Sequence, residues 1–200
     1  MPTASATEQI PARERLLTAA GELFYAEGVH TVGVDRIVAR ANVAKATLYT
    51  LFGSKDGLVR AYLTARHERV RELMIRELAA RYETARARLL GVFEVQGLLF
   101  DEPGFRGCAF VGANAEVADG SSVQELTETY RAWLRSLFHD LANEAGAADP
   151  EALAGQLVLV YDGAGISAWM DRNPGTATLA TAIAGMLIDA AIPDGKEASR

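Results

Sequence analysis

Apolar residues recur with helical spacing in two short blocks near the N-terminus. The first block predicts a helix over residues 34–41, and the second predicts a helix over 45–52 that buries Leu48. The residues between them start with Asn42, which tolerates the left-handed conformation that often follows a helix. Two helices joined by so short a turn form a helix-turn-helix, whose second helix can enter a DNA major groove.

The same periodicity predicts helices along the rest of the chain, and no segment has the alternation typical of a strand. One helix is expected from Pro11 to about Glu27, where Gly28 ends it, and a long helix starts after Ser54, a good N-cap residue. The later helices are expected over 55–81, 83–100, 105–119, 123–145, 151–170 and 176–191. We therefore expect an all-α protein with about nine helices.

These elements divide the chain into four parts. Residues 1–10 and 193–200 are small and polar, and we expect both to be disordered tails. Residues 11–58 form the predicted three-helix head with the helix-turn-helix. Residues 59–192 form a helical body, which the long helix after Ser54 joins to the head.

The net charge of −6 is unevenly distributed along the chain. Residues 1–66 carry eight Lys or Arg against six Asp or Glu, whereas the remaining residues carry 12 against 20. A mildly basic segment around the helix-turn-helix favours contact with nucleic acid, although many segments without that function show as small an excess.

The residues needed for metal, redox or covalent chemistry are scarce. Cys108 is the single cysteine, so an intrachain disulfide and a multi-cysteine zinc site are both excluded. The histidines, His30, His67 and His139, lack metal-ligand spacing, and no catalytic or nucleotide-binding motif occurs. No apolar run reaches the ~18 residues that span a bilayer, and no secretory signal pattern is present. We expect a cytoplasmic protein that is not an enzyme and has no metal or cofactor.

The stretch from Arg15 to Leu58 resembles the TetR/AcrR family of bacterial transcriptional regulators. The matching residues are Ala19–Gly28, Ile37, Ala41, Val43, Thr47, Leu48, Tyr49, Phe52, Ser54 and Lys55. The chain departs from the family pattern at Gly33, which replaces a capping Ser or Thr, and at Asn42, which replaces a turn glycine. Ala44 and Leu51 replace polar or aromatic residues that often touch the DNA backbone.

The resemblance implies a ligand-responsive, DNA-binding regulator, a repressor released from its operator by a small molecule. It implies that the body binds this ligand and forms a homodimer through the last two helices of each chain. The partners would be operator DNA, a second copy of the chain and an effector that the sequence does not identify. The alternative is an all-α small-molecule-binding protein or enzyme whose head no longer binds DNA.

We expect DNA contacts from the exposed side of the second helix of the helix-turn-helix and from basic residues beside it. The alternative for each residue is an ordinary solvated surface. Lysine and arginine meet phosphates or guanine, and threonine can reach a base edge or a thymine methyl. The candidates are Arg36, Lys45, Thr47, Tyr49, Thr50 and Lys55.

The body concentrates aromatic residues that could line a ligand pocket, although each could equally be part of the core. Asn114 lies in an apolar segment and would need a polar partner if buried, and Cys108 is more typical of a small core residue than of a redox sensor. The pocket candidates are Phe93, Phe100, Cys108, Phe110, Asn114, Tyr130, Trp133, Tyr161 and Trp169. The dimer-interface candidates are Leu153, Leu157, Tyr161, Ala164, Leu179, Ile183, Met186 and Leu187.

Overall fold

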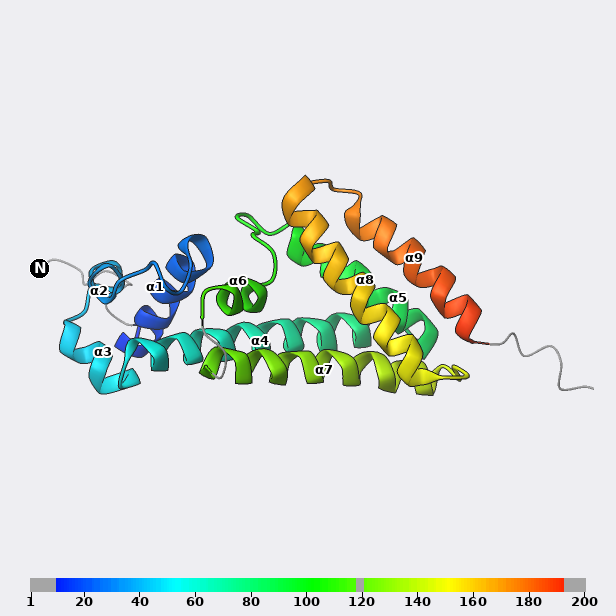
Figure 1. Ribbon diagram of the computed structural model, residues 1–200, viewed down its shortest axis with the longest axis horizontal. Coiled ribbons are helices and arrows are strands. Elements are labelled where there is room, and N and C mark those ends of the chain that lie inside the picture. The colour runs from blue at the N-terminus through cyan, green and yellow to red at the C-terminus, as the bar shows by residue number, and fades with distance from the viewer. Residues whose placement is uncertain (1–9, 118–120, 193–200) are drawn as a thin grey trace, which may run out of the picture. The chain divides into compact units, whose positions relative to one another are not determined.

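A computed structural model of the chain describes residues 10–117 and 121–192 (Figure 1). Nine helices and no strand lie in these ranges, which confirms the all-α prediction, and none of these helices is long and apolar enough to cross a membrane. Except for Ile10, the two expected tails lie outside the described residues. The helices are α1 Ala12–Glu27, α2 Val34–Ala41, α3 Lys45–Phe52, α4 Lys55–Arg81, α5 Ala85–Phe100, α6 Ala109–Ala115, α7 Ser122–Glu144, α8 Pro150–Asp171 and α9 Thr176–Ala191.

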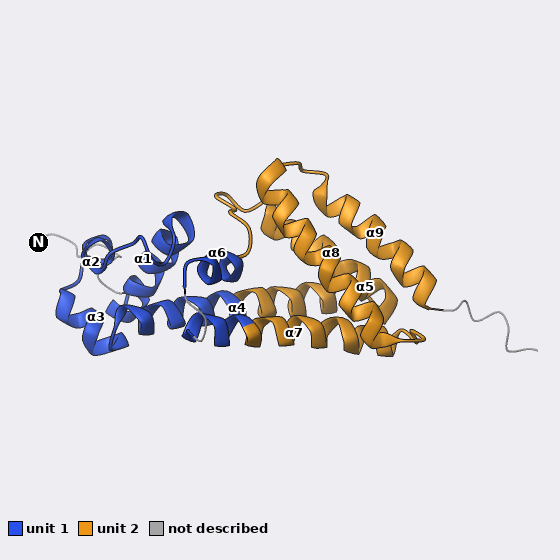
Figure 2. Ribbon diagram, in the orientation of Figure 1, with its two compact units in different colours: residues 1–68, 109–127 blue, residues 69–108, 128–200 orange. Residues whose placement is uncertain are grey.

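The chain divides into two compact units, which Figure 2 colours separately. Unit 1 comprises residues 1–68 and 109–127, and therefore contains α1, α2, α3, α6 and the first parts of α4 and α7. Unit 2 comprises residues 69–108 and 128–200, and contains α5, α8, α9 and the remaining parts of α4 and α7. This division differs from the expected boundary after residue 58, because α6 and the first part of α4 group with the head.

The helix-turn-helix is anchored by a continuous apolar core in unit 1. Leu48 is the one fully buried residue of α3, as predicted, and the Phe24 ring of α1 lies 5.6 Å from the Tyr62 ring of α4. Each fully buried aliphatic or aromatic side chain contributes roughly 1.5–3 kcal/mol to folding. Other core residues of this unit are Leu16, Ala20, Leu23, Ile37, Val38, Ala41, Leu58 and Leu63.

Two local signals set the path of the chain around α3. Asn42 adopts the left-handed conformation predicted for it, with φ 51° and ψ 57°, and thereby ends α2. At the other end of α3, the Ser54 hydroxyl accepts a 3.0 Å hydrogen bond from the Gly57 amide, which confirms Ser54 as the N-cap of α4.

The helix expected over residues 105–119 is much shorter than predicted. Its observed counterpart, α6, covers only Ala109–Ala115, and the expected end at Asp119 lies outside the described residues. Gly104 and Gly107 have φ values of 78° and 82°. Glycine reaches this left-handed region at little cost, and Gly107 turns the chain inside the segment where a continuous helix was expected.

Unit 2 is built around α5, which packs against both α8 and α9. Phe93 of α5 is fully buried, and its ring centroid lies 5.7 Å from that of Phe138 and 6.4 Å from that of Tyr161. At Gly97 the backbone of α5 comes so close to α9 that an added Cβ would lie 2.8 Å from the Ala177 Cβ. Close approach at this glycine fixes the spacing of the two helices.

Candidate nucleic-acid interface

One side of α3 is buried and the other is available for contact. Leu48 is completely buried, whereas Lys45, Tyr49 and Thr50 are exposed and Thr47 is half-buried. The burial of Leu48 fixes which side of the short helix faces the core. The exposed side chains of α3 therefore lie on the remaining faces of the helix. The structure therefore brings the predicted α3 candidates together on one element.

Three exposed basic side chains around α3 are paired with carboxylates. Glu27 binds Arg36 through both oxygens, at 2.5 and 2.8 Å, and this hydrogen bonding raises the pKa of Arg36 above its ordinary value. Asp35 lies 2.8 Å from the Lys45 ammonium and raises the pKa of Lys45 by the same effect. The three pairs at this surface are Arg36–Glu27, Arg40–Glu22 and Lys45–Asp35.

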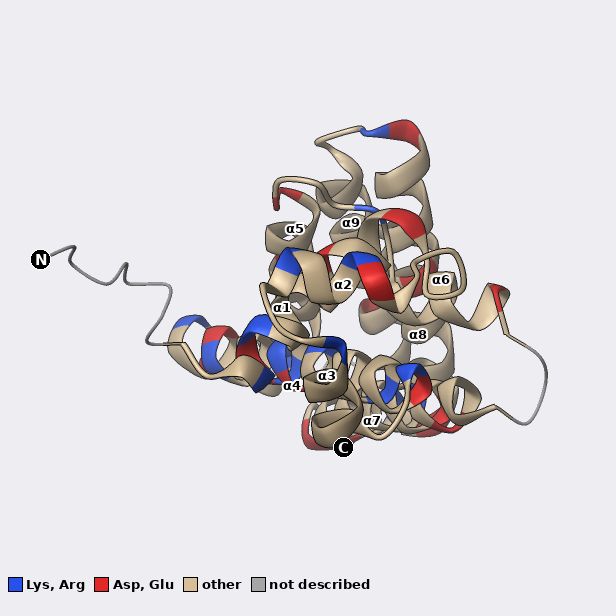
Figure 3. Cartoon of the chain, turned by 90° about the vertical axis from the view of Figure 1, so that its left-hand side faces the viewer, with Lys and Arg blue, Asp and Glu red and all other residues tan. Residues whose placement is uncertain are grey.

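This pairing changes the electrostatics expected from the sequence. Figure 3 shows red acidic positions beside the blue basic positions on α2, while most of α3 carries neither charge. The cations of this surface are therefore locally neutralised in the unbound protein. Exposed ion pairs in water are weak, so a phosphate can compete with each carboxylate for its cation.

The remaining candidates use their polar atoms partly within the protein. The Thr50 hydroxyl donates a 3.0 Å hydrogen bond to the Ala46 carbonyl, and the Lys55 ammonium donates one of 3.0 Å to the His30 carbonyl. The Thr50 oxygen can still accept a hydrogen bond, and the Lys55 ammonium retains two further donors. Tyr49 keeps 45% of its surface exposed, so that its side chain is available for contact with a partner.

A contact with Glu116, the residue that follows α6, fixes the loop that precedes α2. The backbone N–H of His30 donates a 2.7 Å hydrogen bond to the Glu116 carboxylate, 86 residues further along the chain. The same carboxylate lies against Gly28, where an added Cβ would be 2.4 Å from Glu116 Oε1. Nothing in the sequence predicts this contact, because its two sides are so far apart.

Arg13 is a further basic residue of unit 1 that the sequence analysis did not single out. Its guanidinium carbon lies 5.5 Å from the centroid of the Phe52 ring at the end of α3. Among the described residues, no carboxylate pairs with Arg13. Because no described carboxylate neutralises it, Arg13 adds a contact that a DNA phosphate could use beside α3. The only signal for this residue in the sequence is the excess of basic residues in the first 66 positions.

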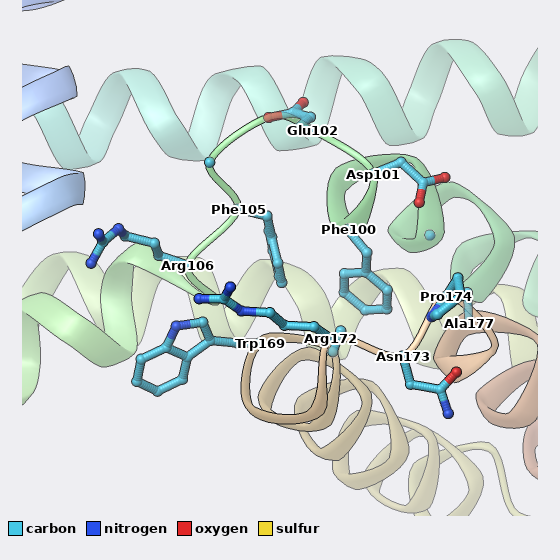
Figure 4. Close-up of a pocket in the computed structure, with 13 residues that line it drawn as sticks. Phe100, Asp101, Glu102, Phe105, Arg106, Trp169, Arg172, Asn173, Pro174 and Ala177 are labelled. Atoms are coloured by element: carbon cyan, nitrogen blue, oxygen red, sulfur yellow. The ribbon is translucent and has the colours of Figure 1, made fainter.

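The nine pocket candidates are dispersed through the fold. Phe100 and Trp169 line a cavity of about 500 Å³ in unit 2 (Figure 4). Phe93, Tyr130 and Tyr161 are buried in unit 2, and Trp133 packs half-buried against the core there. Phe110 is buried in unit 1.

Two of these candidates differ from their predicted environment. Asn114 is exposed on the short α6, so it does not need the buried polar partner that we expected. Cys108 is also exposed and is not a small core residue. The left-handed Gly107 lies in a loop at the start of the expected helix, and Cys108 follows it directly.

Tyr130 and Tyr161 form a polar contact inside a mostly apolar core, where the buried Gln96 also donates a 2.8 Å hydrogen bond to the Tyr161 carbonyl. Their hydroxyls are hydrogen-bonded to each other, and burial, as the largest effect, raises the pKa of both groups well above its usual range. Mutual pairing is how buried hydroxyls avoid the cost of losing water. With their hydroxyls paired to each other, both tyrosines are accounted for as core residues, which was the alternative to lining a ligand pocket.

The candidates for the dimer interface differ in their exposure between α8 and α9. Leu153, Leu157, Tyr161 and Ala164 of α8 are each less than 8% exposed, because they face the core of their own unit. They cannot also present a surface to a second copy. On α9, Leu179 and Met186 are exposed by 63% and 66%, Ile183 is half-buried, and Leu187 packs against the core.

The opposite face of α8 carries the exposed apolar residues. Leu159 and Met170 are exposed by 74% and 70%, and Ile166 lies between them on the same side of the helix. Because α8 packs beside α9, these residues and the exposed residues of α9 belong to neighbouring helices of one unit. Together, Leu159, Ile166, Met170, Leu179 and Met186 are named here the apolar stripe.

Sequence relatives match this chain through its head. The profile described as "Bacterial regulatory proteins, tetR family" matches residues 16–62. The HTH-type transcriptional regulator UidR of Escherichia coli K12 is 36% identical over 63 residues, which make up 32% of this chain and 32% of UidR. The uncharacterized HTH-type transcriptional regulator YdgC of Bacillus subtilis 168 is 36% identical over 64 residues, which make up 32% of this chain and 33% of YdgC. The matched stretch therefore spans about a third of each of these relatives.

Solved structures match nearly the whole chain. SCO4454, a TetR-family transcriptional regulator of Streptomyces coelicolor, is 32% identical, with a TM-score of 0.85 over 91% of this chain and 96% of its own. A putative TetR transcriptional regulator of Streptomyces avermitilis is 34% identical, with a TM-score of 0.79 over 91% of this chain and 98% of its own. The chain therefore belongs to the TetR family of transcriptional regulators.

Proposed function

We propose that the protein is a homodimeric repressor that binds operator DNA through α3 and leaves it when a small molecule binds the helical body. One observation carries the DNA-binding part: α3 is rotated by the buried Leu48 so that Lys45, Tyr49 and Thr50 face outward. A short helix held in this way can insert its polar side chains into the major groove. We place this activity in the cytoplasm, where bacterial DNA lies.

The apolar stripe on α8 and α9 supports the homodimer. Leu159, Met170 and Met186 each expose about two thirds or more of their surface. An exposed row of large apolar side chains is unfavourable in water and marks an interaction surface. In a two-fold dimer the stripe would cover itself, and the two α3 helices would meet half-sites ~34 Å apart.

The release mechanism requires an effector that discriminates between two states of the dimer. A ligand that binds both states equally shifts nothing, so the effector must bind more tightly when the α3 helices do not match the DNA spacing. The cavity in unit 2 is a candidate for that ligand, since its volume of about 500 Å³ lies within the range of small-molecule sites.

A second candidate function is a ligand-binding protein without DNA affinity. It is favoured by the carboxylates that neutralise Arg36, Arg40 and Lys45. If these pairs persisted in the presence of DNA, the surface would offer little attraction to phosphates.

A gel-shift titration against the DNA upstream of the protein's own gene separates the two functions. Wild type should form a complex whose affinity falls steeply with salt, because phosphate binding releases counterions. Tyr49→Ala should weaken it by about tenfold or more, since a hydrogen bond from the tyrosine hydroxyl to a charged phosphate contributes ~1.5–3 kcal/mol. Arg135→Ala, which truncates an exposed residue of unit 2, should bind like wild type. Absence of any complex for wild type would favour the second function.

A further inference from the structure

The cavity of about 500 Å³ in unit 2 has a definite chemical character. Its walls come from the end of α5, the loop that follows it, the end of α8 and the turn before α9. Figure 4 shows aromatic rings and the guanidinium groups of Arg106 and Arg172 on these walls. The residues that decide its chemistry are Phe100, Phe105, Trp169, Arg172, Asp101 and Glu102.

Aromatic rings form the apolar part of the cavity. The centroids of the Phe100 and Phe105 rings lie 5.2 Å apart, and Figure 4 shows the two rings side by side within the cavity. Trp169 is 49% exposed although its Cβ and ring lie close to the backbone at Gly107, where an added Cβ would be 3.6 Å away. Three partly uncovered rings on one cavity favour a ligand with a flat apolar body, which would remove them from water.

Arg106 and Arg172 are the two cationic residues that line the cavity, and the backbone of Arg172 is unusual. It ends α8 in the left-handed conformation, with φ 50° and ψ 35°, a position where glycine or asparagine is preferred. Asn42 performs the same turn after α2 with a residue that tolerates it. Among the described residues, no carboxylate pairs with Arg172. Glycine would adopt this backbone conformation with less strain, so the requirements of the fold do not explain why an arginine side chain is present at position 172.

The acidic residues of the cavity do not cancel this charge. Glu102 is held by Arg69, with 2.5 Å between the charged groups. In Figure 4, the Asp101 carboxylate points away from the Phe105 side, whereas the Arg172 side chain runs beneath Phe105 toward Trp169. Anionic and cationic groups are thus segregated, and the aromatic rings lie on the side of the guanidinium.

We propose that this cavity binds an aromatic carboxylate, with the flat body against Phe100, Phe105 and Trp169 and the carboxylate on Arg172. A guanidinium is suited to this role because it donates two parallel hydrogen bonds to one carboxylate. The proposal names the chemical class of the effector and therefore rests on the proposed function for its biological meaning. The binding itself is independent of DNA.

Calorimetry on the full chain with three probes of equal shape tests the charge requirement. The probes are 1-naphthylacetate, its neutral amide 1-naphthylacetamide, and the cation 2-(1-naphthyl)ethylamine. The carboxylate should bind, and the amide and the amine should each bind about tenfold or more weakly, because a charge-assisted bidentate pair is lost. Equal binding of the three probes, or no binding of the carboxylate, would overturn the proposal.

Variants at position 172 assign the effect to the arginine. Arg172→Gly removes the side chain at a left-handed position that glycine prefers, so the melting temperature should not fall while carboxylate binding drops about tenfold or more. Arg135→Gln, a matched loss of an exposed and unpaired arginine elsewhere in unit 2, should leave binding unchanged. Carboxylate binding by Arg172→Gly as tight as by wild type would contradict the assignment.

The two proposals fail separately. A gel shift without any probe reports DNA binding alone, and calorimetry without DNA reports the cavity alone. A protein that binds DNA but no aromatic carboxylate would overturn the ligand class, and one that binds the carboxylate but no DNA would overturn the proposed function.

Discussion

Lys45 at the start of α3 and Asp35 in the first turn of α2 form an ion pair, with 2.8 Å between Nζ and Oδ1. The lysine is therefore directed across the turn of the helix-turn-helix toward α2. A DNA phosphate that binds Lys45 must compete with this carboxylate, and Asp35 would lie near the phosphate after the exchange. The pair thus lowers the electrostatic contribution of Lys45 to DNA affinity.

Asp35→Asn is expected to tighten DNA binding. The change frees Lys45 and removes a negative charge close to the phosphates, so affinity at low salt should rise about two- to fivefold. The dependence of affinity on salt should also become steeper. Gel shifts over a salt series measure both effects. Glu14→Gln removes the same charge from an exposed position of α1 and is the control. An equal gain from both variants would show that net charge, and not the Lys45 pair, is responsible.

Leu159→Glu should change the oligomeric state, whereas Leu157→Glu should disrupt the fold, although the two positions are two residues apart. Leu159 is 74% exposed on the apolar stripe, so a glutamate there should give a folded monomer. Leu157 is fully buried, and a charge there should unfold unit 2 at a cost above ~4 kcal/mol. Sedimentation measures the mass, and circular dichroism measures the fold. A dimeric Leu159→Glu would exclude the stripe as the interface.

Gly28→Ala should destabilise unit 1. Gly28 has φ 96° and ψ 150°, a conformation that costs a residue with a side chain about 1–3 kcal/mol, and the new Cβ would displace the Glu116 carboxylate from the His30 amide. Urea denaturation measures the free energy of unfolding of Gly28→Ala, of Glu116→Ala and of the double variant. Comparison of the three values with that of wild type gives the coupling free energy between the two sites. The alanine should cost less in the Glu116→Ala background, because the carboxylate is already absent. Additive effects would refute the steric contact.

Alkaline pH should destabilise the protein through Tyr82. Desolvation, followed by the 2.6 Å hydrogen bond to Glu94, raises the pKa of Tyr82 to about 12, against about 10 in an unfolded chain. The contribution of Tyr82 to stability is thus complete below pH 10 and is lost as the pH rises from 10 through 12. Tyr82→Phe should lose less stability over this range in chemical denaturation. Glu94→Gln, which removes the carboxylate, should do the same in part. Parallel curves for wild type and both variants would contradict this assignment.

Local signals in the sequence predicted the backbone path well. Asn42 ends α2 in the left-handed conformation, and Ser54 caps α4, because both depend only on residues within a few positions. The helix that corresponds to α6 was predicted too long because the apolar composition of residues 105–119 suggested a continuous helix. The break at Gly104 was predicted, whereas the left-handed Gly107 was not given enough weight.

Two kinds of feature could not be predicted in this way. One is a contact between residues far apart in the sequence, and the other is the choice between two apolar faces of the same helix. Helix α8 is apolar on two sides, so periodicity alone could not decide whether Leu157 or Leu159 faces the core. The carboxylates that pair with Arg36 and Arg40 come from α1, and their proximity depends on how α1 packs on α2. The exposed side of α3 was predicted correctly, whereas the neutralisation of the cations around it was not.

Selection of DNA from a random-sequence pool tests the central claim most directly, because it needs no knowledge of the operator. A dimer that reads DNA with two α3 helices should enrich an inverted repeat whose half-site centres lie about 10 base pairs, or a multiple of this, apart. Tyr49→Ala in the same selection should enrich this repeat weakly or not at all. Recovery of no common sequence by wild type, or of a single site without two-fold symmetry, would contradict the account.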